Sequence, residues 1–392
     1  MKEEVLGYSN YLLLQGPKGF FFYKLARYLE RLGKIVYKIN FNGGDLLTYP
    51  TLRRVYNYRD KIESFEYYLK NLIALKKIDV VFLYGDYKPY HKIAIKVCKS
   101  LNIPAYVFEE GYIRPNYITL EKHGINGFSE LPKDPAFYKS LPHIEVEEAK
   151  PVNLSYAMQT FSRAFHYISL ELLRWYFPNY VPNKSYFPYL PWIFCWIRGL
   201  IRKPIYLYKE KPLFEKIREL RKRYFLVALQ VHNDTQITLH SNYKSVEEFI
   251  FEVLHSFSKH AKADNYLVFK HHPVDRGFKN YKGLIDKLSE KLGIKEKVFY
   301  VHDMHLPTLI KGSLGVITIN STVGLQALYH HIPLKVMGRA IYDMPDLTFQ
   351  GPLEEFWKDP GQVDKELYEK FRAYVIKTTQ LNGSFWGKFP FD

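Results

Sequence analysis

Cysteine is scarce in the 392-residue chain, which has only Cys98 and Cys195. Two cysteines cannot build a disulfide framework or a cysteine-rich zinc site, and such a composition is typical of a reducing cytosol. Long apolar runs are also missing: the most apolar stretch, residues 189–197, is nine residues long. A membrane-spanning helix needs about 20 residues. The sequence therefore predicts no transmembrane helix, and Glu3 and Glu4 argue against a signal peptide.

Acidic residues are outnumbered, with 40 Asp and Glu against 56 Lys and Arg, so the formal net charge is +16. This excess favours anionic partners such as nucleic acid, lipid headgroups or sugar nucleotides. No motif of a nucleic-acid-binding module occurs, so no nucleic-acid partner is predicted. Walker, GxGxxG and DxD motifs are absent as well. The 47% hydrophobic and 24% charged content is typical of a globular protein and excludes a disordered chain.

Strand-like and helix-like stretches alternate in the first 150 residues and again from about residue 213. Strands are expected at 11–14, 34–40, 78–86, 103–111, 223–231, 265–273, 297–301, 315–320 and 332–338. Helices are expected at 21–33, 62–77, 89–101, 245–261 and 324–331. This order predicts an α/β fold with two Rossmann-like domains built on doubly wound parallel sheets, the GT-B-like architecture of many glycosyltransferases. Ligands of such sheets bind at the carboxyl ends of the strands.

Residues 151–212 interrupt this alternation with 16 aromatic residues, eight Lys or Arg and two acids. Two interpretations remain open: a helical insert packed on the core, or a membrane-surface patch with aromatics at headgroup depth. The expected domains are 1–150 (Rossmann-like, acceptor side), 151–212 (aromatic and basic insert), 213–365 (Rossmann-like, nucleotide-sugar side) and 366–392 (a helix packing across the junction).

Several strand ends carry polar side chains that could take part in catalysis or ligand binding. Glu109 and Glu110 end a buried strand, where paired carboxylates suit acid–base work, although two solvated loop acids are equally compatible with the pattern. The following polar loop contains Arg114, Glu121 and Asn126, which can hold sugars or carboxylates.

In the second half, His272-Pro273 follows a strand and is flanked by Lys270 and Arg276, a set suited to phosphate. Asn320-Ser321-Thr322 forms a strand-to-helix turn, which predicts either an anion site or a helix N-cap. Asp234 follows the first strand of this half and is a candidate nucleophile or base, or an Asx-turn residue. His302 and His305 lack an acidic partner at ligand spacing, so no metal is predicted.

Together these motifs resemble CMP-sugar glycosyltransferases of GT-B type, and most of all the capsular polysaccharide β-Kdo transferases of the KpsS type. The matching stretches are residues 12–22, 108–126, 229–237, 240–243, 270–277 and 319–328. The resemblance implies a retaining glycosyltransferase that moves Kdo from CMP-β-Kdo to a phosphatidylglycerol-type lipid and initiates a poly-Kdo linker. It also implies a peripheral location on the cytoplasmic face of the bacterial inner membrane, with the anionic membrane surface and other capsule assembly proteins as partners. No cofactor and no metal are expected.

The resemblance also implies roles for individual residues. In related enzymes the run DQTxxDxS carries the nucleophile at its second Asp, which Asp234 matches, whereas Leu229 and Gln236 replace the first Asp and the Ser. Glu109 and Glu110 match the acidic catalytic motif. The expected donor-binding residues are Gly16, Lys18, Gln230, Lys270, His272, Pro273, Arg276, Asn320, Ser321 and Thr322, and the other cleft residues are Arg114, Glu121, Asn126 and Gln236.

Two alternatives remain. One is a CDP-glycerol-type phosphotransferase of the teichoic-acid class, which also uses strand-end His-Pro and Ser/Thr turns. The other is a non-catalytic, lipid-binding capsule export partner with a degenerate fold. Donor preference and nucleotide affinity separate these alternatives from the Kdo transferase.

Overall fold

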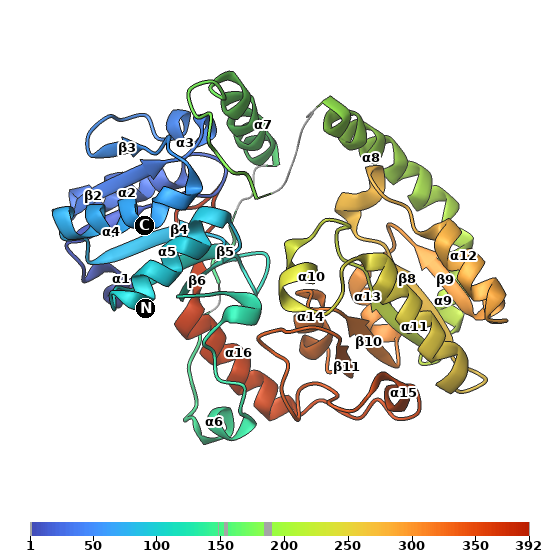
Figure 1. Cartoon of the computed structure of the whole chain (residues 1–392). Coiled ribbons are helices and arrows are strands. Elements are labelled where there is room, and N and C mark those ends of the chain that lie inside the picture. The colour runs from blue at the N-terminus through green and yellow to red at the C-terminus, as the bar shows by residue number, and fades with distance from the viewer. Residues whose placement is uncertain (1, 148, 153–155, 184–189, 392) are drawn as a thin grey trace. The chain divides into compact units, whose positions relative to one another are not determined.

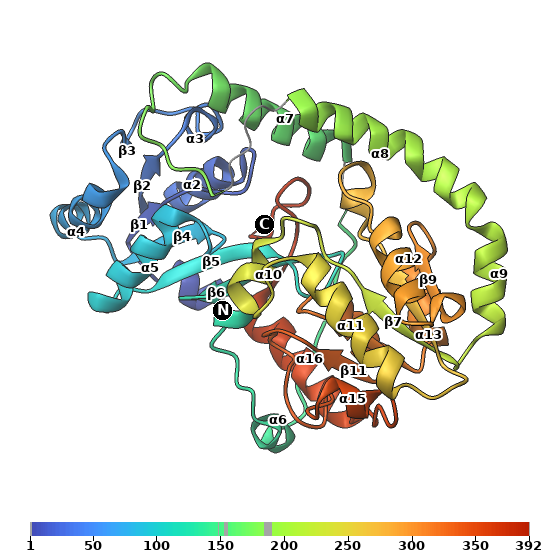
Figure 2. The ribbon, with the colours of Figure 1, turned by 45° about the vertical axis from the view of Figure 1, so that its right-hand side comes forward.

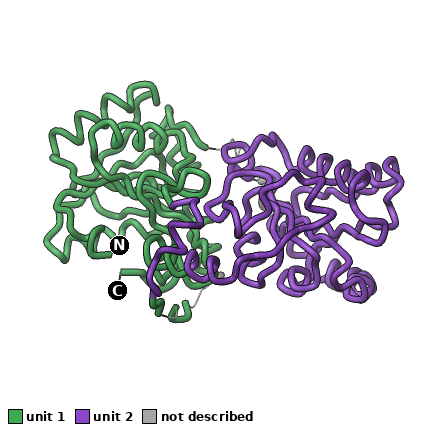
Figure 3. The backbone as a smooth tube through the Cα atoms, turned by 90° about the horizontal axis from the view of Figure 1, so that it is seen from below, with its two compact units in different colours: residues 1–131, 145–185, 373–392 green, residues 132–144, 186–372 purple. Residues whose placement is uncertain are grey.

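The computed structural model describes residues 2–147, 149–152, 156–183 and 190–391. The chain divides into two compact units (Figure 3). Unit 1 comprises Met1–Leu131, Glu145–Ser185 and Ala373–Asp392, and unit 2 comprises Pro132–Ile144 and Tyr186–Arg372. Each unit has its own largely parallel sheet with helices, so the expected GT-B-like pair of Rossmann-like sheets is confirmed.

Unit 1 contains a seven-stranded sheet in the order β12-β6-β5-β4-β1-β2-β3. The strands are β1 (Asn10–Leu13), β2 (Ile35–Asn40), β3 (Val55–Asn57), β4 (Val80–Tyr84), β5 (Ala105–Glu110), β6 (Tyr117–Lys122) and β12 (Gln380–Asn382). The first five strands are parallel; β1, β2, β4 and β5 were predicted, whereas β3 was not. β6 pairs antiparallel with β5, and β12 pairs antiparallel with β6. The stretch expected to be a polar loop after Glu110 therefore contains a strand, because Ile118 and Leu120 alternate into the core.

Side chains of successive strand residues enter two different cores, one on each face of the unit 1 sheet. Leu13, Phe82 and Phe108 join one hydrophobic cluster, and Leu12, Leu83 and Val107 join the other. The helices of unit 1 are α1 (Lys2–Leu6), α2 (Phe21–Arg31), α3 (Gly43–Leu47), α4 (Phe65–Lys76), α5 (Pro89–Ser100) and α7 (Tyr156–Leu172), with 3-10 turns at Ile62–Ser64 and Asn126–Phe128. The sheet is therefore buried on both faces and exposes its strand ends for function.

Unit 2 contains a five-stranded sheet in the order β11-β10-β7-β8-β9, with every pair parallel. Its strands are β7 (Tyr224–Ala228), β8 (Tyr266–Lys270), β9 (Val298–Val301), β10 (Gly315–Thr318) and β11 (Leu334–Val336). All five lie within the stretches predicted to be strands. Near-continuous apolar runs such as Tyr224–Ala228, buried throughout, are what a parallel strand covered on both faces requires.

The helices of unit 2 are α6 (Pro135–Ser140), α8 (Leu190–Lys209), α9 (Lys211–Glu219), α10 (Thr235–His240), α11 (Val246–His260), α12 (Lys282–Lys291), α13 (Leu306–Gly312), α14 (Val323–Tyr329) and α15 (Leu353–Phe356). Two 3-10 turns, η3 (Pro273–Gly277) and η4 (Lys295–Lys297), complete the unit. Helix α16 (Lys365–Thr379) contains the point, after Arg372, where the chain passes from unit 2 to unit 1. The helix expected from residue 366 thus begins at Lys365.

The residues of the expected insert, 151–212, are divided between the two units. Helix α7 packs against α3 in unit 1 (Figure 1), and α8 packs along η3 in unit 2 (Figure 2). Helix α8 packs closely against η3 because residue 277 is a glycine. A Cβ added at Gly277 would come within 1.8 Å of the Cys195 carbonyl oxygen. Arg198 and Arg202 then donate hydrogen bonds to the carbonyl oxygens of Gly277 and Arg276. Residues 153–155 and 184–189 of the expected insert lie outside the described residues.

None of the described helices combines the length and the apolar content that crossing a bilayer requires.

Candidate active site

Glu109 lies at the carboxyl end of β5 in unit 1, as predicted. Consecutive strand residues point to opposite faces, so Glu109 and Glu110 do not share one environment. The Glu109 carboxylate accepts a 3.0 Å hydrogen bond from the Glu110 backbone amide and another from the Tyr84 hydroxyl. Burial raises the pKa of the Glu109 carboxyl to about 7. A carboxyl with this pKa exchanges protons readily near neutral pH.

Two further buried carboxyls, Asp86 and Glu121, lie close enough to Glu109 or to each other to interact electrostatically. Burial raises the pKa of Glu121 to about 7 and that of Asp86 to about 6, and the charge of Asp86 also raises the pKa values of Glu109 and Glu121. Glu121 accepts hydrogen bonds from the Tyr112 and Ser129 hydroxyls. The carboxyls of the acidic cluster, Asp86, Glu109 and Glu121, therefore lose their protons at a higher pH than ordinary carboxyls do.

Asp86 was not among the residues predicted to act. It follows β4 in the pair Gly85-Asp86, and its position at a parallel strand end was the available signal. Its Oδ2 accepts a 3.0 Å hydrogen bond from the Ile125 amide, while Oδ1 is buried without a partner.

Asn126 joins this cluster through Tyr112, because its backbone amide donates a 2.7 Å hydrogen bond to the Tyr112 hydroxyl. Arg114 is different: it is exposed and its Nε donates to the Gly111 carbonyl oxygen at 3.2 Å. Of the predicted cleft residues, Glu121 belongs to the acidic cluster and Asn126 contacts it through Tyr112. The hydrogen bond of Arg114 stays within its own loop.

Three lysines of unit 1 form a chain of electrostatic neighbours, in which Lys88 interacts with both Lys18 and Lys38. Burial lowers the pKa of Lys18 to about 7 and those of Lys38 and Lys88 to about 8. Lys88 feels the charges of Asp45, Lys18 and Glu109. Lys18 lies in unit 1, where its charge acts on Lys88, and its predicted role in donor binding stays a prediction.

Gly16 has a packing role in the same loop. A Cβ at this position would come within 2.9 Å of the Phe22 ring, so the glycine permits the loop to cross α2. Close approach of a ligand is therefore not needed to explain this residue.

In unit 2 the structure brings together four predicted residues. Asp234 caps α10, and its Oδ1 accepts a 2.9 Å hydrogen bond from the Gln236 amide. Gln230 Nε2 donates to Asp234 Oδ2 at 3.3 Å and to Asn320 Oδ1 at 3.0 Å. Asn320 Nδ2 in turn donates to the Gln236 carbonyl oxygen at 3.0 Å. These bonds fix the direction of the Asp234 carboxylate at the carboxyl ends of β7 and β10.

Lys270 and Arg276 were predicted to present positive charge to a phosphate, but both side chains bind groups within the protein. The Lys270 ammonium is buried and donates to the carbonyl oxygens of His271 and His302. Arg276 is paired with Asp303, whose carboxylate accepts from its Nε at 2.7 Å. Both cations therefore join neighbouring strand-end loops to one another, because their partners follow β8 and β9.

The two remaining motifs occupy the places predicted for them, at strand ends. His272 precedes Pro273 at the start of η3, and its Nδ1 accepts a 3.2 Å hydrogen bond from the Val274 amide. Ser321 Oγ accepts from the Val323 amide at 3.2 Å and so caps the start of α14, whereas the Thr322 side chain makes no capping bond.

Two histidine–carboxylate contacts in unit 2 were missed. His232 Nδ1 lies 2.6 Å from Asp275 Oδ1, which ties the Asp234 loop to η3. His302 Nδ1 lies 2.7 Å from Glu210 Oε1, and the His302 ring stacks on Tyr206. The partners are far apart in sequence, so no spacing pattern signalled them.

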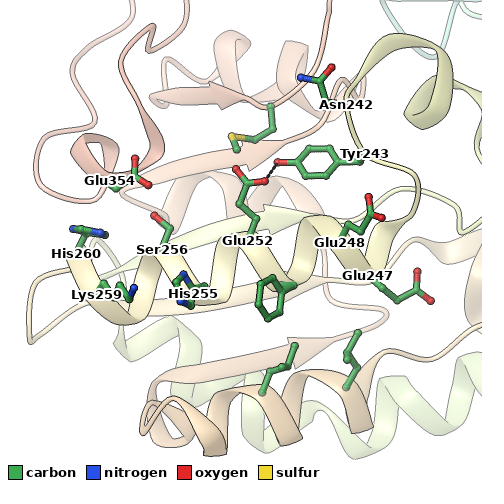
Figure 4. A pocket seen from close by; sticks show the side chains of 14 residues that line it. Asn242, Tyr243, Glu247, Glu248, Glu252, His255, Ser256, Lys259, His260 and Glu354 are labelled. Atoms are coloured by element: carbon green, nitrogen blue, oxygen red, sulfur yellow. Dashed lines mark hydrogen bonds between the residues drawn. The ribbon is translucent and has the colours of Figure 1, made fainter.

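No group of three or more His, Cys, Asp or Glu residues is placed to hold a metal ion within the part of the chain that the structure describes. A pocket in unit 2 lies over α11 and is lined by Tyr243, Glu252 and their neighbours (Figure 4). None of the predicted site residues lines it, so it is separate from the strand-end groups.

The fold and sites define a class: an α/β protein of two Rossmann-like units, each with polar and ionisable groups at its strand ends. Residues 79–386 match the family model described as capsule polysaccharide biosynthesis protein. The chain belongs to this capsule polysaccharide biosynthesis protein family, which confirms the resemblance drawn from the motifs at the level of the family.

Its relatives include the capsule polysaccharide export protein KpsS of Escherichia coli, 41% identical over 390 residues, 97% of this chain and 98% of that protein. The capsule polysaccharide modification protein LipB of Neisseria meningitidis serogroup A is 40% identical over 394 residues, 98% of this chain and 93% of that protein. Among solved structures, the β-Kdo 2,7 transferase of Thermosulfurimonas dismutans KpsC is similar with a TM-score of 0.46 and 16% identity, covering 95% of this chain and 92% of that one.

Proposed function

We propose that the protein is a retaining glycosyltransferase that transfers Kdo from CMP-β-Kdo to a phosphatidylglycerol-type lipid, which initiates the poly-Kdo linker of a capsular polysaccharide. Membership of a capsule biosynthesis family and the motif resemblance support this proposal. The observation that carries it is the Glu109 carboxyl, whose pKa is raised to about 7 at the end of a parallel strand. Such a group can accept the proton of an acceptor hydroxyl near neutral pH.

In the first step the Asp234 carboxylate attacks the anomeric carbon of Kdo. The bond to the CMP phosphate breaks with its electron pair, CMP leaves, and a Kdo–Asp234 ester forms. The hydrogen bonds from Gln230 and the Gln236 amide orient the attacking carboxylate. A phosphate leaving group needs hydrogen-bond donors rather than a proton, so the proposed reaction uses neither a cofactor nor a metal.

In the second step Glu109 takes the proton of the acceptor hydroxyl. The hydroxyl oxygen attacks the anomeric carbon, and the ester bond breaks and regenerates the Asp234 carboxylate. Two successive inversions give net retention. Of the paired acids, we assign the base to Glu109 because burial raises the pKa of its carboxyl to about 7, close to the pH at which a base must act.

We assign the CMP moiety to unit 2, where His272, Asn320, Ser321 and Thr322 lie at the ends of β8 and β10. Asn320 is held by Gln230, whose Oε1 accepts its backbone amide at 3.2 Å. This bond links the orientation of Asp234 to the loop assigned to the donor.

We further propose a peripheral location on the inner face of the bacterial inner membrane. Exposed apolar side chains on α8, such as Phe194, Leu200 and Ile201, accompany four Lys or Arg and no acid in the helix. This composition favours an interface with anionic lipids. Other capsule assembly proteins remain expected partners.

The test is mass spectrometry of a fluorescent phosphatidylglycerol analogue after incubation with the protein and CMP-Kdo generated in situ. A mass gain of one Kdo is the expected result. Consumption of CDP-glycerol without CMP-Kdo turnover would favour the phosphotransferase instead. Liposome binding without any nucleotide affinity would favour an export partner, a possibility of interest because the Escherichia coli relative is named an export protein.

A further inference from the structure

Helix α7 is amphipathic in the reverse of the usual sense. Its buried face consists of polar or small residues, and its exposed face is apolar. The buried residues are Ser162, His166 and Ser169, and the exposed ones are Met158, Phe161, Ile168 and Leu172. A helix that only completes a hydrophobic core would show the opposite pattern. The inward face of α7 therefore has a role other than core packing.

The inward face of α7 approaches α3 closely at two glycines. A Cβ added at Gly43 would come within 2.1 Å of the Ser169 carbonyl oxygen, and one at Gly44 within 2.5 Å of the His166 ring. His166 is 7% exposed; its ring interacts with the Gly44 backbone, and its Nδ1 is buried with no other hydrogen-bond partner among the described residues. An unpartnered buried nitrogen costs free energy unless a ligand reaches it.

Three lysines surround this imidazole: their charges, after burial, lower the pKa of His166, in the order Lys18, Lys88 and Lys38. Lys18 donates to the Tyr167 hydroxyl of α7 and lies 4.2 Å from the centre of that ring. Lys88 lies 5.2 Å from the centre of the Tyr84 ring. Lys38 donates to the Ile39 carbonyl oxygen.

Other charged groups face the same lysines. Arg163 of α7 adds a fourth positive charge close to Lys18. Asp45 acts on Lys38 and Lys88, and Glu109 acts on Lys88. Four cationic side chains thus face two acids, one of which has a pKa of about 7. Burial and this excess of positive charge both favour loss of protons from the lysines unless an anion joins them.

We propose that Lys18, Lys88 and His166 bind a phosphate group in unit 1. Resting on the proposed function, this phosphate is that of the glycerophospholipid acceptor, which the site holds beside Glu109. A glycerol headgroup carries its hydroxyls only a few bonds from its phosphodiester, so phosphate binding near Lys88 brings a hydroxyl toward the base. The site is thereby a positioning site for the acceptor.

The outward face of α7 supports a lipid rather than a soluble phosphate. The helix that supplies His166 and Tyr167 inward presents Phe161, Ile168 and Leu172 outward, each at least 58% exposed. An apolar stripe beside an anion site matches the two parts of a phospholipid, its acyl chains and its headgroup.

Binding has a proton signature. The pKa values of Lys18 and Lys88 are lowered to about 7 and about 8, so at pH 8 these ammonium groups are partly deprotonated. A bound phosphate favours their charged forms and that of His166. The site therefore takes up protons when it binds the anion at pH 8.

The experiment is isothermal titration calorimetry of the full chain at pH 8 with glycerol 3-phosphate, in two buffers that differ in ionisation enthalpy. Binding with net proton uptake is expected. Lys18→Gln and Lys88→Gln should each weaken it roughly tenfold or more. The matched control is Lys96→Gln, because Lys96 is exposed on α5, the helix that begins directly after Lys88. This substitution should not change the affinity for glycerol 3-phosphate. CMP affinity should be the same in all four proteins.

Further titrations distinguish the source of the phosphate. Phe161→Ser and Ile168→Ser should weaken binding of lysophosphatidylglycerol but not of glycerol 3-phosphate; equal affinity for the lysolipid in these variants would point to a soluble phosphate compound. Glycerol 3-phosphate affinity unchanged in both lysine variants, or no binding to the wild type, would overturn the site. Loss of CMP affinity in the lysine variants would assign the cluster to the donor and overturn the acceptor role.

These outcomes are independent of Kdo transfer. If glycerol 3-phosphate binds through the lysines but no Kdo is transferred to any lipid, the phosphate site stands and the proposed function fails. If Kdo is transferred while the lysine variants bind the phosphate normally, the proposed function stands and the phosphate site fails.

Discussion

The imidazole of His166 lies so close to the α-carbon of Gly44 that a methyl group there would come within 2.5 Å of the ring. This approach joins α3, which follows β2, to a helix more than a hundred residues later in the chain. It also places His166 where the charges of Lys18, Lys88 and Lys38 act on its ring. Gly44 therefore permits α7 to pack against α3 and also determines where the His166 ring lies.

Gly44→Ala should displace α7 from α3. We expect a loss of about 1–3 kcal/mol in the free energy of unfolding, because the ring or the helix must move to admit the methyl group. Affinity for glycerol 3-phosphate should fall with it. Urea unfolding and calorimetry check both. Gly283→Ala is the control: no atom lies within 4 Å of a Cβ there, and alanine should be neutral or stabilising in α12.

Glu109→Gln should reduce Kdo transfer by roughly 10²–10⁴-fold, the usual effect of removing a general base. In the wild type the base acts when deprotonated, so kcat/KM should rise with pH and level off above about pH 7. Steady-state kinetics from pH 5 to 9 measure this limb. Glu110→Gln should retain most of the activity and the same limb; if it abolished transfer instead, the base would be reassigned to Glu110.

The buried Glu121 carboxyl should make the protein less stable as pH rises. Its pKa is about 7 in the folded protein and about 4.5 when unfolded, so its stabilising contribution is complete below pH 4.5 and is lost as pH rises through 7. Glu121→Gln removes this titration. Relative to the wild type, the variant should gain up to about 3 kcal/mol between pH 5 and pH 8 in urea unfolding. Parallel stability profiles for the two proteins would show that Glu121 does not titrate in this range.

Asp234→Asn should abolish transfer while CMP still binds. The asparagine keeps a side-chain oxygen for the Gln236 amide, so α10 retains its cap and the fold is preserved. Asp234→Ala should also be inactive but lose about 1 kcal/mol of stability with the cap. Transfer assays and CMP titration measure the two effects. Full activity in either variant would exclude a covalent role for this carboxylate.

Lys270→Met should lower stability rather than CMP affinity. The buried ammonium donates to two carbonyl oxygens, and losing it leaves them unsatisfied at a cost of about 1–3 kcal/mol. Thermal unfolding and CMP titration separate the two effects. Lys287→Met, an exposed position on α12, is the control and should change neither quantity. A selective loss of CMP binding in Lys270→Met would restore the predicted donor contact.

The strands of both sheets could be predicted because their signal is local. Runs such as Val80–Tyr84 and Tyr224–Ala228 are apolar along their length, and turn residues follow them. The end of each strand then followed directly, which is why Glu109 and Asp234 could be named as candidates. β6 was missed because this stretch was interpreted as a polar loop from Arg114, Glu121 and Asn126, although Ile118 and Leu120 alternate with polar residues. β3 and β12, three residues each, were not predicted either.

The partners of the site residues could not be predicted in the same way. Lys270 has the sequence context of a phosphate ligand, yet its ammonium donates a hydrogen bond to the carbonyl oxygen of His302, which follows a different strand. Asp86 carries no motif, yet it raises the pKa values of two other carboxyls. Such interactions depend on residues far apart in the chain.

The sequence by itself determined the α/β class, the positions of the parallel strands and the strand-end motifs, because side-chain periodicity and turn chemistry act over a few residues. Only the tertiary structure decided that α7 and α8 belong to different units, that Glu109 shares its surroundings with Asp86 and Lys88, and that His166 is turned inward. Burial and charge proximity cause these differences, and both arise from packing between distant segments.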